Sequence, residues 1–519
     1  MSSVKNILFH ALPAWGTVSF IVLIPLAVII TRARPDIVIT VITTGIIYPK
    51  FNNELKSKLS VEEYDLLSPR INIIDVCGPN VNPFEPLKEF APAYTAIWSS
   101  ESILCKSSGK TFTALAPPTV AILDPFTPYA YESIYAISQK KVPIISWVSG
   151  PSGPLLRIFG PASLGGDADP SLETEAGLKL ARAQLLEPPS EAAKSMVGSN
   201  VTSDTSLEKS NVPGMPPMYA HEWKPQISLL PEGPLVRFGQ IYTRAGDGVI
   251  VVSNSVYEQE SINATKKWFS GIGKPCYALA PLTLPNSKGQ EDTEHREVTH
   301  FLDSVNERFG PRSLIYISFG TFFWPPEQEK LVAVIETLLA NQIPFIFSHS
   351  SPMANNLSTE FLASINNSGF AMEMVWSPQE TILQHKVTGW FITHGGWNSI
   401  QEAFEHKVPL IFWPMGGDQP INAAVLSLTH KAAFELIEVR SGKDGTKPLL
   451  RFESTEYKPT FTVDAVKAEV GELLEKIKSD EGQLVRSNFE KLGKEMWRSW
   501  DEGGQSRVEL NEFLDMYCI

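Results

Sequence analysis

The most informative part of the chain is residues 376–419, which read WSPQETILQHKVTGWFITHGGWNSIQEAFEHKVPLIFWPMGGDQ. Within this segment, residues 389–393 are predicted to form a strand, residues 394–396 (His-Gly-Gly) a turn, and the residues from Trp397 onward a helix. A helix that begins at glycine presents free backbone N–H groups and the positive end of its dipole, which suits a diphosphate. The segment therefore predicts a strand, a glycine turn and an anion-binding helix.

The first two turns of the predicted helix carry polar side chains that suit a nucleotide. Asn398 and Ser399 lie in the first turn, and Glu402 follows four residues after Asn398 on the same face of the helix. A carboxylate one turn below a phosphate site can accept hydrogen bonds from a ribose diol. Many phosphate and dinucleotide binders share a strand–Gly–Gly–helix element, and such a turn can also be purely structural, so this element alone does not identify the ligand.

Outside this segment, short apolar runs alternate with longer helix-patterned segments, which is typical of an α/β fold with parallel sheets. Ligands of such sheets gather at the carboxyl ends of the strands, so the residues that follow each strand are the place to look for a site. Besides 389–393, the runs expected to be strands are 5–9, 37–42, 121–123, 142–147, 249–253, 314–319 and 343–347.

The length of the chain, 519 residues, exceeds the roughly 250–300 residues at which a single hydrophobic core stops growing, so we expect two domains. A polar stretch without apolar periodicity, 286–296, is interpreted as the linker, which places the domains at 1–285 and 297–500. Residues 161–217 are rich in Gly, Ser, Asp, Glu and Pro, and we expect them to form a flexible flap in the first domain.

Charge and cysteine content exclude several classes of partner. The formal net charge is −13 and no cluster of Lys and Arg is present, which argues against nucleic-acid binding. The four cysteines are widely spaced and form no C-x-x-C pair, so we expect no metal site and a reduced, cytoplasmic setting. Residues 18–30 are largely apolar, but Ser19 and Pro25 divide them into pieces too short to span a bilayer, which favours a buried helix over a signal or anchor.

The complete string 376–419 closely resembles the donor-binding signature of the family-1 UDP-glycosyltransferases, in register and without insertion or deletion. The resemblance implies the GT-B fold, in which two Rossmann-like domains with parallel sheets face each other and the last helix, here within 501–519, crosses back to the first domain. It also implies that a UDP-sugar is the donor substrate, and we expect no cofactor.

The family's residue roles transfer to the matching positions of the signature. Each position also has a structural alternative: the first Trp as a core aromatic, the His as a strand-end residue, the Glu as an exposed helix residue, and the closing pair as a simple turn. A closing Gln is commonly associated with glucose donors. The resemblance assigns Trp376 to uracil stacking, Gln379 to the edge of uracil and ribose, His394 to the diphosphate, Gly396, Trp397, Asn398 and Ser399 to the phosphate and sugar pocket, Glu402 to the ribose hydroxyls, and Asp418 and Gln419 to the sugar hydroxyls.

Two further stretches are similar to the same family. Residues 317–321 (ISFGT) resemble the strand-to-loop element whose small hydroxyl residue approaches the phosphates, which makes Thr321 a candidate donor contact. Residues 213–219 resemble a stretch of fungal members. The resemblance therefore spans the chain, and it is sharper in the second half.

The resemblance breaks at the catalytic base. The family usually has a His just after a Gly in the first βα loop, oriented by an Asp about a hundred residues later. Here residues 12–18 read LPAWGTV, so Thr17 occupies the position of the His, and its hydroxyl is not a useful base at neutral pH. The position of the Asp corresponds to Asp124.

Several groups could replace the missing His. His10 follows the first strand and is either a base that approaches Asp124 or a packed strand-end residue, and His221 is a second candidate. Asp124 could also act directly as the base. A phenolic or carboxylate acceptor would need little help, because it is already acidic. These alternatives stay open at the level of the sequence.

The sequence thus predicts an inverting UDP-glycosyltransferase that moves glucose from UDP-glucose to a hydroxyl of a small lipophilic or phenolic acceptor. The alternative is a UDP-sugar-binding protein without transfer activity, because Thr17 replaces the usual His. A nicotinamide-dependent oxidoreductase is disfavoured, because the nearest glycine string, 271–274, lacks the third Gly of the dinucleotide fingerprint. The chain also contains no nucleophile elbow, zinc-protease or P-loop motif.

Overall fold

A computed structural model of the chain describes residues 4–13, 20–80, 82, 86–186, 209–227, 233–284, 293–354 and 357–518. Three predicted features lie wholly or partly outside these ranges, namely Thr17, the flap at 161–217 and the linker at 286–296.

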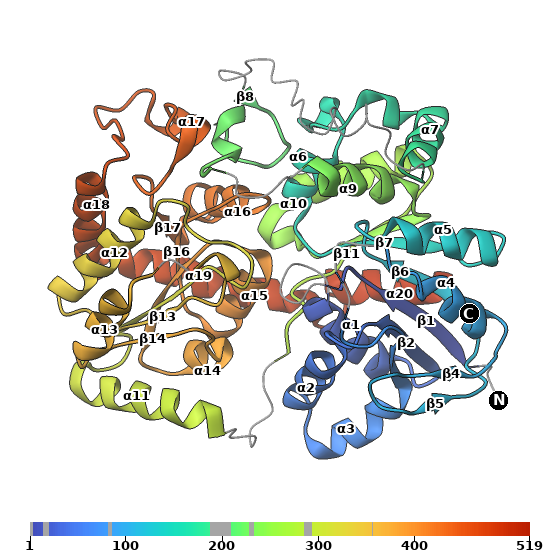
Figure 1. Cartoon of the computed structure of the whole chain (residues 1–519). Coiled ribbons are helices and arrows are strands. Elements are labelled where there is room, and N and C mark those ends of the chain that lie inside the picture. Colours follow the sequence, from blue (N-terminus) through green and yellow to red (C-terminus); the bar gives the residue numbers. More distant parts are fainter. Residues whose placement is uncertain are drawn as a thin grey trace. The chain divides into compact units, whose positions relative to one another are not determined.

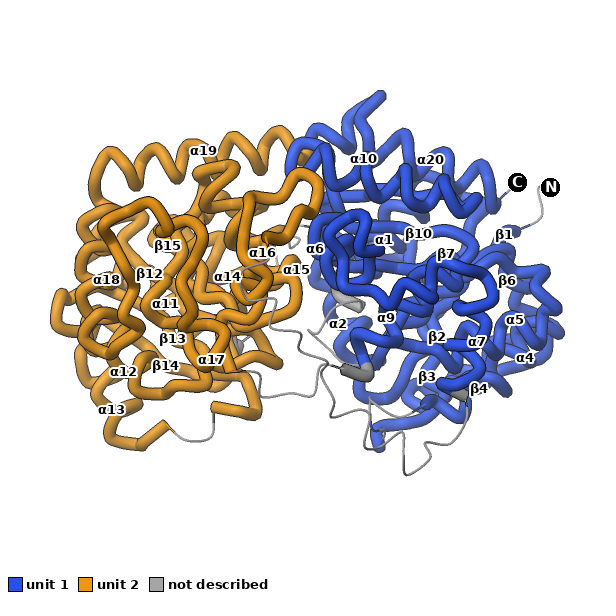
Figure 2. The backbone as a smooth tube through the Cα atoms, turned by 90° about the horizontal axis from the view of Figure 1, so that it is seen from above, with its two compact units in different colours: residues 1–200, 232–290, 498–519 blue, residues 201–231, 291–497 orange. Residues whose placement is uncertain are grey.

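The chain divides into two compact units (Figure 2). Unit 1 combines residues 1–200, 232–290 and 498–519, and unit 2 combines residues 201–231 and 291–497. The segment 201–231 therefore groups with the second half of the chain, whereas the sequence placed it with the residues that precede it.

The centre of unit 1 is a seven-stranded sheet with the order β11-β10-β7-β6-β1-β2-β3, in which every pair of neighbours is parallel (Figure 1). Its strands are short apolar runs, mostly buried along their length, as expected for a parallel sheet that is covered on both faces. The strands are β1 (Lys5–His10), β2 (Ile37–Thr43), β3 (Ile71–Asp75), β6 (Pro118–Leu123), β7 (Ile144–Val148), β10 (Gly248–Val251) and β11 (Cys276–Ala278).

Helices pack on this sheet, and a small antiparallel pair, β4 (Ile103–Leu104) with β5 (Thr111–Phe112), lies beside them. The last helix belongs to unit 1: the Glu509 carboxylate accepts the N–H of Ala278 in β11 at 2.6 Å. The helices of unit 1 are α1 (Phe20–Ala33), α2 (Tyr48–Lys58), α3 (Val61–Leu67), α4 (Phe90–Trp98), α5 (Pro128–Ile137), α6 (Ser152–Phe159), α7 (Glu175–Leu186), α9 (Gly233–Ala245), α10 (Ser255–Gly271) and α20 (Gln505–Tyr517).

Unit 2 is built on a six-stranded sheet with the order β14-β13-β12-β15-β16-β17, again with parallel neighbours. The carboxyl ends of all six strands therefore lie at one edge, which is where ligands of such sheets bind. The strands are β12 (Leu314–Ser318), β13 (Phe345–Ser348), β14 (Ala371–Met374), β15 (Thr388–Thr393), β16 (Leu410–Phe412) and β17 (Ala433–Glu435).

Two long helices, α12 and α18, pack against each other in unit 2, and α19 packs on α15 (Figure 1). The helices are α11 (Thr293–Phe309), α12 (Gln328–Ala340), α13 (Thr359–Asn367), α14 (Gln379–Gln384), α15 (Trp397–His406), α16 (Gln419–Ala424), α17 (Gly442–Gly445), α18 (Val463–Lys476) and α19 (Asp480–Trp497).

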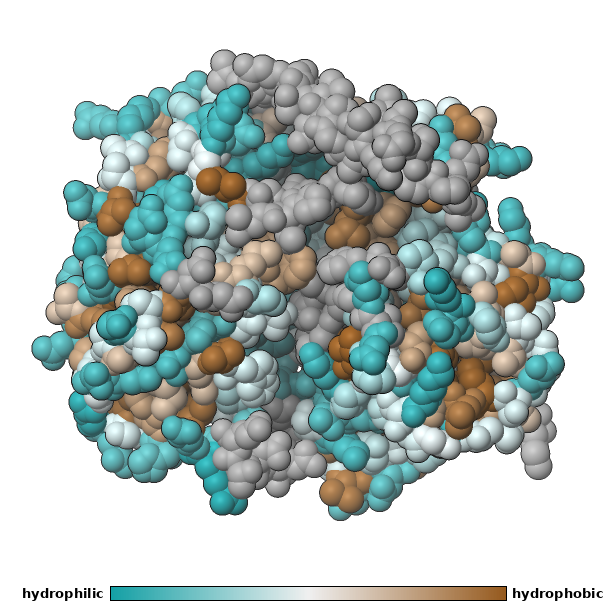
Figure 3. Space-filling view, in the orientation of Figure 1, coloured by the Kyte–Doolittle hydropathy of each residue, from teal (hydrophilic) through white to brown (hydrophobic). Residues whose placement is uncertain are grey.

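The predicted α/β class with two parallel sheets is confirmed, and the expected strand at 389–393 is β15. The apolar run at 18–30 contributes to α1, a helix of 14 residues, and among the described helices none is both long and apolar enough to cross a membrane. On the coloured part of the face in Figure 3, hydrophobic side chains are scattered among hydrophilic ones rather than gathered in one broad patch.

Candidate active site

His394 follows directly after β15, at the carboxyl edge of the unit 2 sheet, and it is buried. Two glycines leave room for its imidazole: a Cβ added to Gly320 would lie 3.0 Å from Cε1 of the ring, and one added to Gly396 would lie 2.6 Å from Nε2. Burial lowers the pKa of His394 to about 4, so the ring is neutral at pH 7. It can therefore offer a hydrogen bond to a ligand but not a positive charge.

Helix α15 begins at the double glycine, as the sequence predicts. Gly395 has a φ of +90°, a conformation that favours glycine, and Gly396 is the N-cap residue and provides no side-chain cap. The Asp418 carboxylate accepts the backbone N–H of Trp397 and the Nδ2 of Asn422, the latter at 2.8 Å. Burial nevertheless raises the pKa of Asp418 to about 6. A titratable carboxylate thus lies at the start of this helix.

Asn422 of α16 braces the same turn. Its Nδ2 also donates to the carbonyl oxygen of Gly395 at 3.0 Å, so one amide group links the glycine turn to Asp418. The residue is fully buried. Asn422 could not be predicted from the sequence, because a single Asn four residues after Asp418 carries no recognisable signal without the fold.

Gln379, at the start of α14, contacts the first two turns of α15. Its Nε2 donates to Oε2 of Glu402 at 2.6 Å and lies 3.4 Å from the hydroxyl of Ser399. The hydroxyl of Tyr316 in β12 donates to Oε1 of Gln379 at 3.3 Å and bonds Ser377 at 2.7 Å. Three residues that the sequence assigned to one ligand are therefore neighbours. Tyr316 was missed, because it lies within an apolar strand and looks like a core residue.

The two tryptophans of the signature have opposite environments. Trp376, in the loop between β14 and α14, is 56% exposed, so it is not a core aromatic. Trp397, in the first turn of α15, is 3% exposed and packs inside unit 2. Asn398 beside it is half-buried. An exposed indole leaves a large apolar surface in contact with water, which is unfavourable unless a ligand covers it. This favours a stacking role for the exposed Trp376, whereas the burial of Trp397 favours a packing role.

Gln419 closes the signature and is buried. Its Oε1 accepts the backbone N–H groups of Met415 at 2.9 Å and of Gly416 at 3.1 Å, so the side chain holds the loop that follows β16. With Oε1 engaged in this way, the Nε2 group is the end of the amide that can donate to a ligand. The pair Asp418 and Gln419 is therefore part of an organised loop rather than a simple turn.

Thr321 lies in the loop after β12, half-buried and one residue beyond Gly320, whose Cβ position faces the His394 ring. The aromatic rings of Phe319 and Trp413 meet edge to face at 5.3 Å, which ties this loop to the loop after β16. In the loop after β13, Ser350 donates to the carbonyl oxygen of Gly320 at 3.0 Å. The loops after β13, β12 and β16 thus meet near His394, which follows β15.

His10 is the last residue of β1 in unit 1, and it is fully buried. Its Nδ1 lies 2.9 Å from the carbonyl oxygen of Ile42 and therefore carries the proton, and its Nε2 accepts the phenolic hydroxyl of Tyr129 at 2.9 Å. Burial lowers the pKa of His10 to about 4. Both nitrogens are thus engaged within the unit, as in a packed strand-end histidine, and neither bonds the Asp124 side chain.

Asp124 follows β6, and its backbone N–H donates to the carbonyl oxygen of His10 at 3.1 Å, so the two residues are neighbours at the edge of the unit 1 sheet. The carboxylate is buried and accepts the backbone N–H of Phe126 at 2.9 Å and that of Leu12 at 3.4 Å. The other candidate, His221, lies in unit 2 and donates to the carbonyl oxygen of Pro448 at 2.8 Å.

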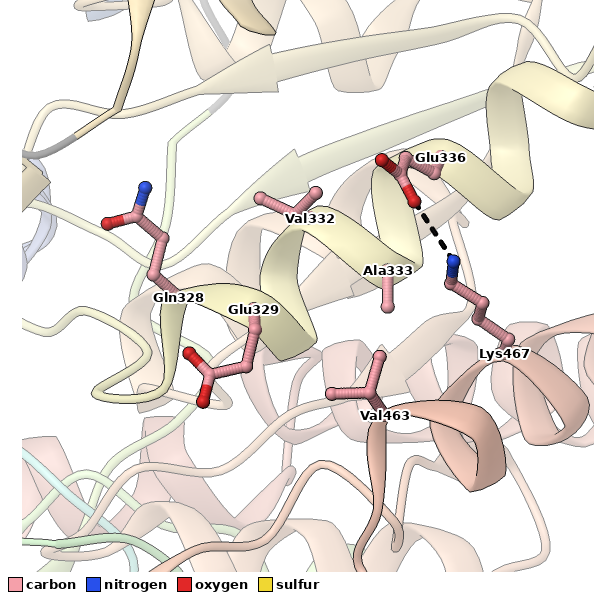
Figure 4. Close-up of a pocket in the computed structure, with 7 residues that line it drawn as sticks. All are labelled: Gln328, Glu329, Val332, Ala333, Glu336, Val463 and Lys467. Carbon is pink, nitrogen blue, oxygen red and sulfur yellow. Dashed lines mark hydrogen bonds and ion pairs between the residues drawn. The ribbon is translucent and has the colours of Figure 1, made fainter.

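Unit 2 also contains a groove and a cluster of acidic and histidine side chains that do not include the residues described above. A groove lies between α12 and α18, where Lys467 forms an exposed ion pair with Glu336 at 3.0 Å (Figure 4). Ligand atoms of Glu380, Glu405 and His406 lie within 4.8 Å of one another. All three side chains are partly exposed and have other interactions, so this cluster does not by itself indicate a metal.

Because His10 is buried, we expect the free energy of unfolding to fall in acid. Because its pKa is lower in the folded chain (about 4) than in the unfolded chain (6.5), only the unfolded state binds the proton between these values. The free energy of unfolding therefore falls as the pH drops from 6.5 to 4, by roughly 3 kcal/mol from this group. In His10→Asn, whose amide can still donate to Ile42, the thermal midpoint should fall less between pH 7.5 and pH 5 than in the wild type. Equal losses in the two proteins would contradict this assignment.

Comparisons with known proteins find chains of similar sequence and fold. A model of the family described as "UDP-glucoronosyl and UDP-glucosyl transferase" matches residues 286–444. Over 494 residues the chain is 28% identical to the UDP-glycosyltransferase eriJ of Hericium erinaceus, and the match covers 92% of each chain. It is 34% identical over 195 residues to the anthocyanidin 3-O-glucosyltransferase UFGT of Vitis vinifera, a match that covers 37% of this chain and 39% of the relative.

Solved structures share the fold. A UGT transferase from Siraitia grosvenorii in complex with UDP has a TM-score of 0.67 at 18% identity, and the match covers 99% of this chain and 100% of that one. UGT71G1 from Medicago truncatula, complexed with UDP-glucose, has a TM-score of 0.65 at 20% identity, and the match covers 99% of this chain and 98% of that one. The fold is therefore GT-B, and the chain is similar in sequence to UDP-glycosyltransferases along most of its length.

Proposed function

We propose that this protein transfers glucose from UDP-glucose to the hydroxyl of a small phenolic or lipophilic acceptor, with inversion at the anomeric carbon. The observation that carries the proposal is the contact between Gln379 and Glu402, 2.6 Å apart beside the start of α15. It joins two side chains that the signature assigns to one nucleoside. The relatives named as glucosyltransferases and the closing Gln419 favour glucose as the sugar.

In the proposed reaction, the acceptor oxygen attacks the anomeric carbon while the bond from that carbon to the UDP oxygen breaks. The diphosphate gains negative charge as it leaves, and the N-terminal amides of α15 are suited to stabilise this charge. Neutral His394 would add a hydrogen bond to a phosphate oxygen. Glu402 would accept the ribose hydroxyls, and Trp376 would cover the uracil face.

The acceptor must also lose its proton, and His10 in unit 1 is a weak base. It has a pKa of about 4, and both of its nitrogens are engaged within the unit. We therefore infer that the acceptor supplies much of the acidity itself. Phenols fit this requirement better than aliphatic alcohols.

A second function, binding of a UDP-sugar without transfer, is favoured by the lack of a strong base in the position where the family has its His. Thr17 stands at the usual position of the His, and the nearby His10 is committed to Ile42 and Tyr129. In that case, UDP-glucose would bind to the protein, and no glucoside or UDP would be formed with any acceptor.

Transfer assays with a series of phenols separate the two functions. The rate at pH 7.5 should rise with the acidity of the phenol, because a weak base leaves most of the proton removal to the acceptor. Product and released UDP are measured for para-substituted phenols and for an aliphatic alcohol of similar size. An alcohol that reacts as fast as the most acidic phenol would contradict the acidity requirement, and binding of UDP-glucose without product would favour the second function.

The space around His394 offers a test of donor binding. In Gly396→Ala the new methyl group would lie 2.6 Å from Nε2, so the imidazole must turn away from its present position. Loss of a hydrogen bond to a charged group should raise the dissociation constant of UDP about tenfold or more in titration calorimetry.

The matched control for this variant is Gly471→Ala in α18, where an added Cβ meets nothing within 4 Å. Alanine also favours a helix, so this control should bind UDP like the wild type. If Gly396→Ala binds UDP with wild-type affinity, His394 does not contact the diphosphate.

A further inference from the structure

Residues 209–227, which we call the strap, come from the first half of the chain but belong to unit 2. The strap contains an antiparallel pair, β8 (Lys209–Ser210) with β9 (Met218–Tyr219), followed by the short helix η4 (Ala220–Trp223). Helix η4 packs against α16 and α17. The strap therefore contacts the element that begins with Gln419.

Gln226, near the end of the strap, is buried and uses both ends of its amide. Its Nε2 donates to the carbonyl oxygens of Pro414 at 3.3 Å and Val439 at 3.2 Å. Its Oε1 accepts the hydroxyl of Ser441 at 2.7 Å. Because that hydroxyl oxygen already accepts the N–H of Ile227 at 3.1 Å, its proton points to Gln226, which fixes the orientation of the amide.

The carbonyl group of Pro414 that accepts from Gln226 belongs to a peptide group that also contacts Gln419. The carbonyl of Pro414 and the N–H of Met415 are two ends of one planar peptide unit. Gln226 holds the carbonyl end, and the N–H end donates to Oε1 of Gln419 at 2.9 Å. A shift of Gln226 would therefore move the group that orients the Gln419 amide.

We propose that Gln226 is a positioning residue for the donor sugar: through the Pro414–Met415 peptide it sets the direction in which the Gln419 amide faces the sugar hydroxyls. The proposal rests on the proposed function, because it requires that Gln419 contacts the sugar. Gln226 itself contacts no substrate in this account. Its loss should affect recognition of the sugar and leave recognition of uridine diphosphate intact.

The test compares donor sugars in Gln226→Met, which keeps the length of the side chain and removes its hydrogen bonds. The ratio of kcat/KM for UDP-glucose to that for UDP-galactose, which differs at one hydroxyl, should fall about tenfold, the scale of one buried hydrogen bond. The inhibition constant of UDP should stay within about twofold of the wild-type value, because no nucleotide contact changes.

A double mutant tests whether Gln226 acts through Gln419. If it does, Gln226→Met combined with Gln419→Ala should have the same sugar ratio as Gln419→Ala alone, since coupled residues are not additive. Additive effects of the two substitutions would overturn the proposal.

The control is Glu222→Ala in the same strap, whose carboxylate accepts the N–H groups of Tyr219 and Leu450, each at 2.9 Å; neither residue lies in the loop after β16. It should lower the thermal midpoint without changing the sugar ratio. If Glu222→Ala lowers the ratio as much as Gln226→Met does, the strap has only a structural role.

A second variant covers the case in which Gln226→Met does not fold. Ser441→Ala removes the hydroxyl that fixes the amide and should lower the sugar ratio in the same direction. A wild-type ratio in this variant would overturn the proposal. If the wild-type protein binds UDP but transfers no glucose, the proposed function fails, and the ratio of dissociation constants for the two UDP-sugars still tests Gln226.

Discussion

The start of α15 depends on a glycine turn that is held in place by contacts with residues from several other loops. Gly395 takes a conformation that favours glycine, Asn422 holds its carbonyl oxygen, and the Asp418 carboxylate accepts the N–H of Trp397. The His394 ring fits only because Gly320 and Gly396 lack side chains. A helix terminus fixed in this way keeps its amide dipoles aimed at one place, and electrostatic stabilisation of a leaving diphosphate requires such preorganisation.

The sequence predicts the frame of this site well, because its signals are local. A strand, a double glycine and a helix are consecutive in the chain, so β15 and α15 could be located from residue pattern alone. Tyr316 and Asn422 could not be found in this way. Their partners lie on other strands and loops, and only the strand order of the sheet brings Tyr316 to Gln379 and Asn422 to Gly395.

The contacts of the strap and of His10 also join residues far apart in the chain, so the sequence alone does not predict them. Polar composition predicts loops in 161–217, but no local pattern indicates that Gln226, beyond this segment, donates a hydrogen bond to Pro414, 188 residues later in the chain. Sequence position places His10 at the correct edge of its sheet, yet the choice between base and packed residue depended on two contacts, with Ile42 and Tyr129. Burial that holds an imidazole neutral also makes it a poor proton acceptor.

A crystal structure of the protein with UDP would locate the donor site. We expect the diphosphate to bind at the backbone N–H groups that begin α15, within hydrogen-bond distance of His394, with the ribose on Glu402 and the uracil against Trp376. A well-ordered UDP that binds elsewhere on the protein, with the start of α15 left without phosphate, would contradict the proposed donor site.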